Sequence, residues 1–511
     1  MFERLIDSTL AEAARQRIAE FFVTHAEWFY TLSDGDVVAL RRSELDITLV
    51  HGRLILSCWT DKGMRSWRIR GCDWAGDKLL LQTSRRMGAE RAVIELVPRA
   101  SASSIAVAVK AARLVRSNGL AKLAAAVRPG TKIERTALSP GIRRGQPGRY
   151  ARIILRQQHQ RIAVTGSVAS SKASEVDAFL AAALLWFIRS SERAHSPFIQ
   201  QLWLIVEPDL IKQLTHRLAL LRESLRGAIA VYEVDDAWGE LVPVPCPPRT
   251  ELWKRRLARF PPVNEPETSE LADSICALAP GAIDIVHARH GQTLRYFGLP
   301  FARVRRVMNT ERAWFGVAGP NRRLLDEKTE QSWAALLSDL REHRSATALD
   351  HRHALHRNAA EAWLESLLRR DITRLDPGLI IAPLHAQFRT ARGGRLGVRP
   401  IDLLALRSDG RLAVIELKVS EDREHVLQGA DYWQRVEAHR RRGHISRAKL
   451  FGERRIRDQP PLVYLVAPTL RVHPSFQKLA RLIAPDIEIY RFDINEDWRA
   501  GVRVMRRMRV S

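Results

Sequence analysis

Short runs in which apolar and polar residues alternate dominate the first hundred positions of the chain. They follow a helical pattern over residues 11–22, and glycines separate them. A period of two is typical of strands with one buried face, and glycines between such runs indicate turns. The clearest runs are residues 45–50, 53–57, 66–70 and 78–82. We therefore predict a β-rich module, a small barrel or a sandwich, which with an alanine-rich helix over residues 105–127 makes residues 1–145 the first domain.

The next stretch alternates apolar runs with helical patterns. Residues 139–148 are rich in glycine and proline, which indicates a linker before it. Strands are then expected at residues 151–155, 161–165, 201–206 and 228–232, and helices at 176–188 and 210–225. Strands that alternate with helices define an α/β layer, which we assign to residues 149–260. From residue 261 to 350 the pattern is less regular, and we expect a linking region of helices and strands.

The last third of the chain has the most regular pattern. A helix is expected at residues 359–371, strands at 379–388, 400–406 and 411–418, a helix at 420–442, a strand at 461–466, a helix at 475–483 and a strand at 487–491. Asp409 and Gly410 indicate a tight hairpin between the second and third strands. Ser420 is the expected N-cap of the long helix, and Gly443 is its expected stop. The whole chain is thus predicted to be a multidomain α/β protein, with residues 351–511 as its last domain.

Glu416 and Lys418 stand two residues apart on the third of these strands. Because side chains alternate across a strand, the two share one face, and the apolar Ile415 and Leu417 take the other. Charged side chains on such an apolar strand are costly to bury, which indicates a function. The hairpin can bring Asp402, on the preceding strand, level with Glu416.

Two carboxylates from neighbouring strands form a hard oxygen site that suits Mg²⁺ or Mn²⁺. A metal in this place can polarise a phosphate and acidify a bound water. Lys418 can orient that water or help to deprotonate it, and it can offset developing negative charge. We therefore expect a Mg²⁺-dependent or Mn²⁺-dependent site at Asp402, Glu416 and Lys418.

The long helix that follows carries a polar stripe at spacings of three and four residues. Its members are Gln428, Tyr432, Arg435 and His439. Residues with this spacing lie on one helix face. The stripe could present hydrogen-bond donors to a phosphodiester backbone beside the metal.

The ordered set Asp402, Glu416-x-Lys418 and Gln428-x₃-Tyr432 resembles the PD-(D/E)XK nuclease superfamily, the restriction-endonuclease-like group. The resemblance extends over about residues 355–495, and the order helix, three strands, helix, strand matches the αβββαβ core of that superfamily. It implies a Mg²⁺-dependent nuclease that hydrolyses phosphodiester bonds of DNA. In such an enzyme Asp402 and Glu416 would hold the metal, and Lys418, Gln428 and Tyr432 would belong to the active site.

Two details qualify the resemblance. The proline of the superfamily pattern is displaced, because Ile401 precedes the aspartate and Pro400 lies one residue early. The superfamily often adds a glutamate from its first helix, for which Glu361 and Glu365 are both candidates. We prefer Glu361 as the third metal ligand, because it lies nearer the apolar centre of the helical wheel. Gln387 is a candidate outer contact.

Each candidate also has a plainer interpretation. The acids and the lysine could form a structural ion pair, although the cost of burying charge argues against it. Gln428 and Tyr432 could belong to an ordinary half-exposed helix face, and either glutamate could be a surface charge. The basic tail, residues 499–509, could be a solvated face or part of a nucleic-acid groove.

The middle α/β unit repeats the alternation of strands and helices of the last domain, but it lacks the acids of that domain. Residues 161–166 have the apolar run but no Glu-x-Lys, and no strand aspartate precedes them. We therefore consider a degenerate copy of the nuclease core, kept for binding or assembly. Asp177 and Glu207 in this unit are expected to be surface residues.

The composition of the chain indicates a binding partner and a cellular compartment. The 511 residues include 82 Lys and Arg against 57 Asp and Glu, which gives a formal charge of +25. Such an excess favours attraction to a polyanion, of which DNA is the obvious one. The four cysteines form no CxxC pair and suit a reducing compartment. No apolar stretch is long enough to span a bilayer, and the first residues do not follow a signal-peptide pattern, so we expect a cytoplasmic protein without a membrane partner.

Three functions compete at this point. The leading one is a metal-dependent DNA nuclease, in defence or repair. The second is a nucleic-acid-binding scaffold with an inactive nuclease fold, and the third is a protein–protein module of a defence or repair complex. The intact set of acids and lysine argues against an inactive fold. The chain has no Gly-Lys-Ser/Thr phosphate loop, so we expect no helicase activity of its own. The pattern leaves open which nucleic acid is cut, which partner binds and how many chains associate.

Overall fold

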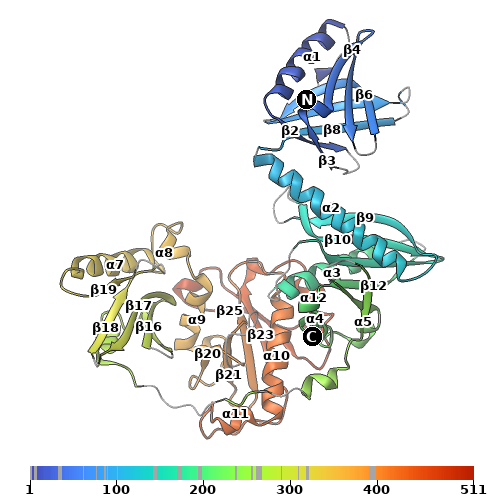
Figure 1. Cartoon of the computed structure of the whole chain (residues 1–511). Helices are drawn as coiled ribbons and strands as arrows, with labels where there is room; N and C mark the ends of the chain where they lie inside the picture. Colours follow the sequence, from blue (N-terminus) through green and yellow to red (C-terminus); the bar gives the residue numbers. More distant parts are fainter. Residues whose placement is uncertain are drawn as a thin grey trace. The chain divides into compact units, whose positions relative to one another are not determined.

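A computed structural model describes the chain except for residues 1–2, 5–7, 33–36, 61–62, 76, 86–87, 89, 101, 142–146, 170–174, 194–197, 236–238, 255–256, 261–266, 289–290, 309, 318–321 and 391–398. It is a mixed α/β protein built on four sheets, as Figure 1 shows. Its contacts define two compact units. The first comprises Met1–Ser171, Arg193–Pro208 and Ala230–Val244, and the second comprises Lys172–Glu192, Asp209–Ile229 and Pro245–Ser511.

The chain begins with a helix and an antiparallel sheet. Helix α1 (Ser8–Val23) buries Ile18 and Phe22 in the same core as Trp28 and Trp67 of the strands. The described strands all belong to one sheet with the order β3-β2-β8-β7-β6-β5-β4, and β1 pairs with β6. They therefore do not form two facing sheets, and the sandwich alternative is wrong for this module. The strands are β1 (Glu3–Arg4), β2 (Glu27–Leu32), β3 (Val37–Arg41), β4 (Leu45–Val50), β5 (Arg53–Thr60), β6 (Gly63–Ala75), β7 (Lys78–Arg85) and β8 (Glu90–Pro98).

A second sheet follows helix α2 (Ala102–Ala126), which packs Leu120 and Ala124 against it. The strand order is β14-β13-β12-β11-β10-β9. The ends of the expected linker belong to this sheet, because β9 extends to Pro140 and β10 starts at Pro147. The elements are β9 (Lys132–Pro140), β10 (Pro147–Gln157), β11 (Gln160–Ser167), α3 (Val176–Arg193), β12 (Ile199–Val206), α4 (Pro208–Leu218), α5 (Glu223–Gly227), β13 (Ile229–Val234) and β14 (Leu241–Val244).

The expected linking region contains a module with its own core. Its strands form an antiparallel sheet in chain order, and Phe301, Trp333 and Leu340 are buried beneath it. The elements are α6 (Glu270–Ala277), β15 (Ile283–Ala288), β16 (Gly291–Tyr296), β17 (Leu299–Val307), β18 (Thr310–Phe315), β19 (Arg323–Leu324), α7 (Glu330–His343) and α8 (Ala354–Arg357).

The last sheet has the order β20-β21-β22-β23-β24-β25. Its first three strands are antiparallel, β22, β23 and β24 are parallel, and β25 returns antiparallel to β24. The elements are α9 (Ala360–Arg370), β20 (His385–Phe388), β21 (Ile401–Leu406), β22 (Leu412–Leu417), α10 (His425–Arg441), α11 (His444–Arg447), β23 (Leu462–Pro468), α12 (Phe476–Ala480), β24 (Ile489–Ile494) and β25 (Val504–Arg509).

Local details of this domain differ from the sequence prediction. The strand expected at residues 379–388 is reduced to β20, and Leu379 makes only an isolated bridge to Arg407. Helix α10 starts at His425 and not at Ser420, because the Asp422 carboxylate accepts a hydrogen bond from the Glu424 amide (2.6 Å) and holds this segment in a turn.

The ends of the domain complete the comparison. Gly443, with φ of 63°, follows α10 as expected. Much of the basic tail forms an edge strand, β25, that the sequence pattern did not reveal. Within the described part of the chain, no helix combines the length and apolar character needed to cross a membrane.

Candidate functional site

The hairpin of β21 and β22 places the two expected acids side by side. Gly410, with φ of 83°, sits in its turn, and Leu403 pairs with Ile415. The next pair of positions, Asp402 and Glu416, is therefore level across the two strands. The Asp402 Oδ2 atom also accepts a hydrogen bond from the Leu417 amide at 2.9 Å.

The expected alternation along β22 is present. Ile415 and Leu417 lie in one core with Trp363 and Leu364 of α9. On the opposite face, Val414 shares a second core with Tyr432 and Val436 of α10. Glu416 follows Val414 by two residues, so its side chain leaves the strand on the α10 face.

Glu416 and Lys418 form a buried pair at the end of this strand. The Lys418 Nζ atom lies 2.9 Å from Glu416 Oε1 and 3.7 Å from Asp422 Oδ2. Glu416 is only 2% exposed, and its second oxygen, Oε2, is buried with no hydrogen-bond partner among the described residues. A buried carboxylate oxygen without a partner is costly, and a bound cation would remove that cost.

The charges of the site are strongly coupled. Burial raises the pKa of Glu416 well above its usual value, and the nearby charge of Asp402 raises it further, against the effect of Lys418. Burial alone would lower the pKa of Lys418, but the carboxylates of Glu416 and Glu361 outweigh it and raise that pKa. The ammonium is therefore charged, and the two strand carboxylates lie too close to share the site without competing for a cation or a proton.

The two helix glutamates occupy different surroundings. Glu361 is exposed, and burial of its carboxyl group raises its pKa, opposed by Lys418 and supported by Asp402. Glu365 is buried, and Gln387 donates Nε2 hydrogen bonds to Glu365 Oε2 (2.7 Å) and Asp402 Oδ1 (3.4 Å). Gln387 thus links α9 to the strand acid, as an outer contact would.

The polar stripe of α10 is largely buried, so the plainer interpretation of a half-exposed helix face is wrong. Gln428, Tyr432 and His439 are all buried, and Arg435 is partly exposed. His439 Nε2 lies 3.0 Å from the Thr390 carbonyl oxygen, and its ring stacks on Phe260 at 4.3 Å. His439 is therefore engaged in the core, away from the start of the helix.

Gln428 and Tyr432 remain close to the acids. Burial raises the pKa of the Tyr432 hydroxyl, and the charge of Glu416 raises it further. The Gln428 Nε2 atom donates to Glu424 (3.3 Å), and its Oε1 atom is buried without a partner among the described residues. These side chains can position groups around the site, but they do not present a row of donors to solvent.

One residue beside the site, His425, was not expected from the sequence. His425 Nε2 lies 3.3 Å from the Glu416 carbonyl oxygen, and burial together with the charge of Lys418 lowers its pKa to about 4. The imidazole is therefore neutral at pH 7. Its position in the first turn of the helix after the Glu-x-Lys strand is the only signal in the sequence.

The donor set suits a hard divalent cation. Asp402, Glu416 and Glu361 supply carboxylate oxygens of the kind that Mg²⁺ and Mn²⁺ prefer, and Glu416 Oε2 is free to coordinate. Among the described residues, however, no group of three or more His, Cys, Asp or Glu side chains is already arranged to hold a metal. Asp402 bonds to the Leu417 amide and Glu416 to Lys418, so metal binding would require these side chains to turn.

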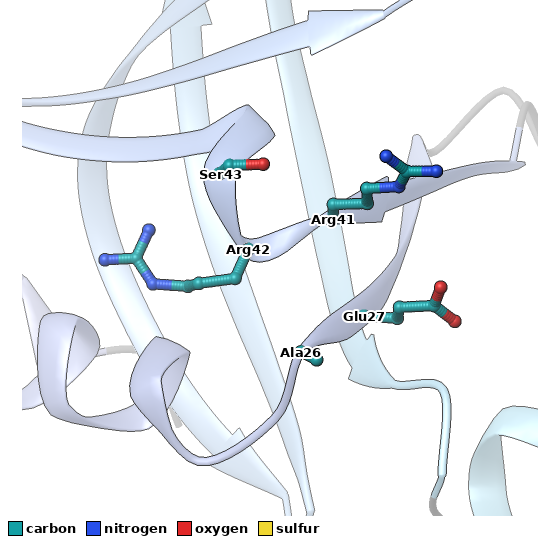
Figure 2. A pocket seen from close by; sticks show the side chains of 5 residues that line it. All are labelled: Ala26, Glu27, Arg41, Arg42 and Ser43. Carbon is teal, nitrogen blue, oxygen red and sulfur yellow. The ribbon is translucent and has the colours of Figure 1, made fainter.

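A hollow elsewhere lacks these features. In the N-terminal module, Ala26, Glu27, Arg41, Arg42 and Ser43 line a shallow pocket. Figure 2 shows its two arginines pointing in opposite directions, so they do not converge on one ligand. Glu27 is already paired with Arg99 at 2.5 Å.

Comparisons with protein-family models, curated proteins and solved structures found no match to this chain.

Proposed function

We propose that the chain is a Mg²⁺-dependent or Mn²⁺-dependent nuclease that hydrolyses phosphodiester bonds of DNA. One observation carries the proposal. A hairpin holds Asp402 level with Glu416, and Lys418 Nζ lies 2.9 Å from Glu416, whose second oxygen is buried without a partner among the described residues. A structural ion pair would use both oxygens, since an unpaired buried oxygen only destabilises the fold.

Each residue then has a defined role. Asp402, Glu416 and Glu361 would hold the metal, which when bound polarises the phosphate and acidifies a water. Lys418 is charged and next to Glu416, so it would orient the attacking water and offset the negative charge that develops on the phosphate. Gln387 and Gln428 would hold the carboxylates and the start of α10 in place.

The reaction is a simple hydrolysis. The water oxygen forms a bond to phosphorus, and one phosphorus–oxygen ester bond breaks. The proton of the water leaves to solvent or a nearby carboxylate, and the departing sugar oxygen gains a proton. The formal charge of +25 would hold the polyanionic substrate.

The test is incubation of the full chain with linear, circular, single-stranded and branched DNA in Mg²⁺, Mn²⁺ or EDTA. We expect cleavage of at least one substrate with either metal and none with EDTA. Lys418→Ala should reduce single-turnover cleavage by orders of magnitude, because it removes the group that orients the nucleophile, while DNA binding changes little.

Lys449→Ala is the matched control, since Lys449 pairs only with exposed Glu453. It should cleave like the wild type. Asp402→Ala should also be inactive but partly restored by excess Mn²⁺, which should not restore Lys418→Ala. Equal cleavage by wild type and Lys418→Ala would show that this site is wrongly assigned. Tight DNA binding without cleavage of any substrate would favour the scaffold function instead.

A further inference from the structure

The middle sheet and the last sheet have the same plan. Each follows a helix, α2 or α9, and each has six strands in one continuous order. In both, the first two pairings are antiparallel, the third is parallel and the last is antiparallel. A helix follows the third strand in each case, α3 or α10, and another precedes the fifth, α4 or α12.

The two plans also agree in how the third and fourth strands are joined. Strands β11 and β12 pair in parallel with α3 between them in the sequence, and β22 and β23 pair in parallel with α10 between them. This shared topology indicates a duplicated fold.

The faces of the strands show what stands at the chemical positions in the middle copy. Val164 and Val168 share a core with Leu120 of α2, so the face of β11 that corresponds to the α10 face of β22 carries Ala163, Thr165 and Ser167. On the neighbouring strand, Arg152 pairs with Thr165 and Tyr150 pairs with Ser167. None of these residues is an acid or a lysine, so this face of the middle copy lacks the ligands for a metal.

The helices of the two copies meet through reciprocal contacts within the second compact unit. The segment after α4 meets the segment after α12, where Leu221 forms an antiparallel bridge with Ile483. The Arg222 amide donates to the Leu482 carbonyl at 2.8 Å, and the Ala484 amide donates to the Leu220 carbonyl at 2.9 Å. The middle copy donates the first of these bonds and accepts the second, which is the exchange that a two-fold axis through the bridge requires.

Salt bridges follow the same exchange. Helix α10 of one copy meets α4 of the other through Asp431 and Arg217, while α3 meets α12 through Glu192 and Lys478 at 3.4 Å. Arg217 also bonds to Asp177 at 2.6 Å. Burial alone would lower the pKa of Arg217, but both aspartates outweigh it and raise that pKa. Asp177 is thus a buried interface residue, and its assignment to the surface was wrong.

We infer that the chain is a fused pair of one fold, joined by a two-fold contact of its own helices, of which only the C-terminal copy can cut. The inference rests on the proposed function. A dimeric nuclease with two competent sites can break both strands of a duplex in one encounter. In this chain the second copy is part of the same polypeptide and has no site. One chain therefore breaks one strand and leaves a nick in the duplex.

The experiment uses the full chain and a supercoiled plasmid with Mn²⁺. We expect nicked circles as the first product, formed at a rate proportional to enzyme concentration, with linear DNA appearing only later from independent nicks. Linear DNA formed in step with the loss of supercoiled DNA, or a rate that rises with the square of enzyme concentration, would overturn the inference while leaving the nuclease function standing. No broken strand at all would reject the proposed function and the inference with it.

A second measurement does not depend on activity. Mn²⁺ binding by calorimetry should vanish in Asp402→Ala, because that copy alone has ligands. Ser167→Ala, on the corresponding face of the middle copy, should bind Mn²⁺ and nick like the wild type. Mn²⁺ binding that persists in Asp402→Ala at about half of the wild-type stoichiometry would locate a second centre and overturn the inference.

Discussion

At the scale of single residues, Glu416 carries most of the information. Its Oε1 atom contacts Lys418, its backbone carbonyl contacts His425, and its Oε2 atom is buried without a partner among the described residues. The contacts with Lys418 and His425 give its Oε1 atom and its carbonyl oxygen a partner, as in any structural residue. An unsatisfied oxygen beside a second carboxylate is what the proposed metal site requires and what an ion pair of the core would avoid.

The choice between the two glutamates of α9 can be tested at this scale. Glu361→Gln should raise the Mg²⁺ concentration for half-maximal cleavage at least about tenfold, because a coordinating charge is lost. Glu365→Gln should raise it less, since Glu365 contacts Gln387 and is buried beside the site rather than in it. Glu453→Gln, at an exposed ion pair, serves as the control. If the larger shift belongs to Glu365→Gln, the ligand assignment within α9 is reversed.

At the scale of elements, one buried arginine joins the strands of one module to the helix of the next. Arg344 is fully buried after α7 and has no carboxylate partner among the described residues. It donates to the carbonyls of Tyr296 and Phe297 (2.8 and 2.7 Å) and to those of Leu355 and Asn358 (2.6 and 2.8 Å). Burial and then Arg499 lower its pKa to about 9. The guanidinium therefore fixes the position from which α9 begins.

Arg344→Met should lower the free energy of unfolding by about 3 kcal/mol or more, because several buried carbonyls lose their donor. Arg344→Lys should not restore it, since an ammonium cannot reach four carbonyls in a planar fork. Arg357→Met, at an exposed position in α8, should have little effect. Denaturant unfolding of the three variants is the measurement, and equal stability of Arg344→Met and wild type would contradict this role.

Helix α10 gives the protein a dependence on pH. Burial lowers the pKa of His439 to about 4, against the effect of the hydrogen bond that its imidazole donates to the Thr390 carbonyl oxygen. In the unfolded chain this pKa is about 6.5, so the unfolded state binds more protons between these values. Stability should therefore be complete above about pH 6.5 and fall as the pH drops toward 4.

Between pH 7.5 and pH 5 the loss from this residue should be about 2 kcal/mol. His439→Phe cannot bind the proton, so its unfolding free energy should change less than that of the wild type over the same interval. Urea titrations at both pH values provide the comparison. An equal pH dependence in wild type and variant would show that other groups control it.

The sequence predicted the elements whose pattern is local. The hairpin at Asp409–Gly410, the strand with Glu416 and the stop at Gly443 follow from turn chemistry and alternation, and they are confirmed, although the strand ends one residue before Lys418. The burial of α10 could not be predicted, because its contacts are non-local: Arg217 of α4 pairs with Asp431, and Trp253 and Phe260 pack on Trp433 and His439. Periodicity gives the faces of a helix, but it does not say how many neighbours those faces meet.

At the scale of the whole molecule, we expect the excess of positive charge to control the encounter with DNA, the proposed substrate. The formal charge of +25 belongs to many exposed side chains, so no single residue should dominate binding. The logarithm of the DNA association constant should fall linearly with the logarithm of salt concentration, with a slope of about −0.9 for each phosphate contacted.

Lys418→Ala should change that slope by about one at most. Fluorescence anisotropy with a labelled duplex across a range of salt concentrations measures it. A binding constant that does not depend on salt would remove a nucleic acid as the natural partner.

The bridge between Leu221 and Ile483 has a consequence for the assembly of the chain. The segments after α4 and after α12 meet there, and both belong to one polypeptide. Their contact is therefore made at an effective concentration on the order of millimolar, so dilution does not separate them. Under the inferred duplication, only one copy needs to keep the acids, while the strands of the other need only to fold.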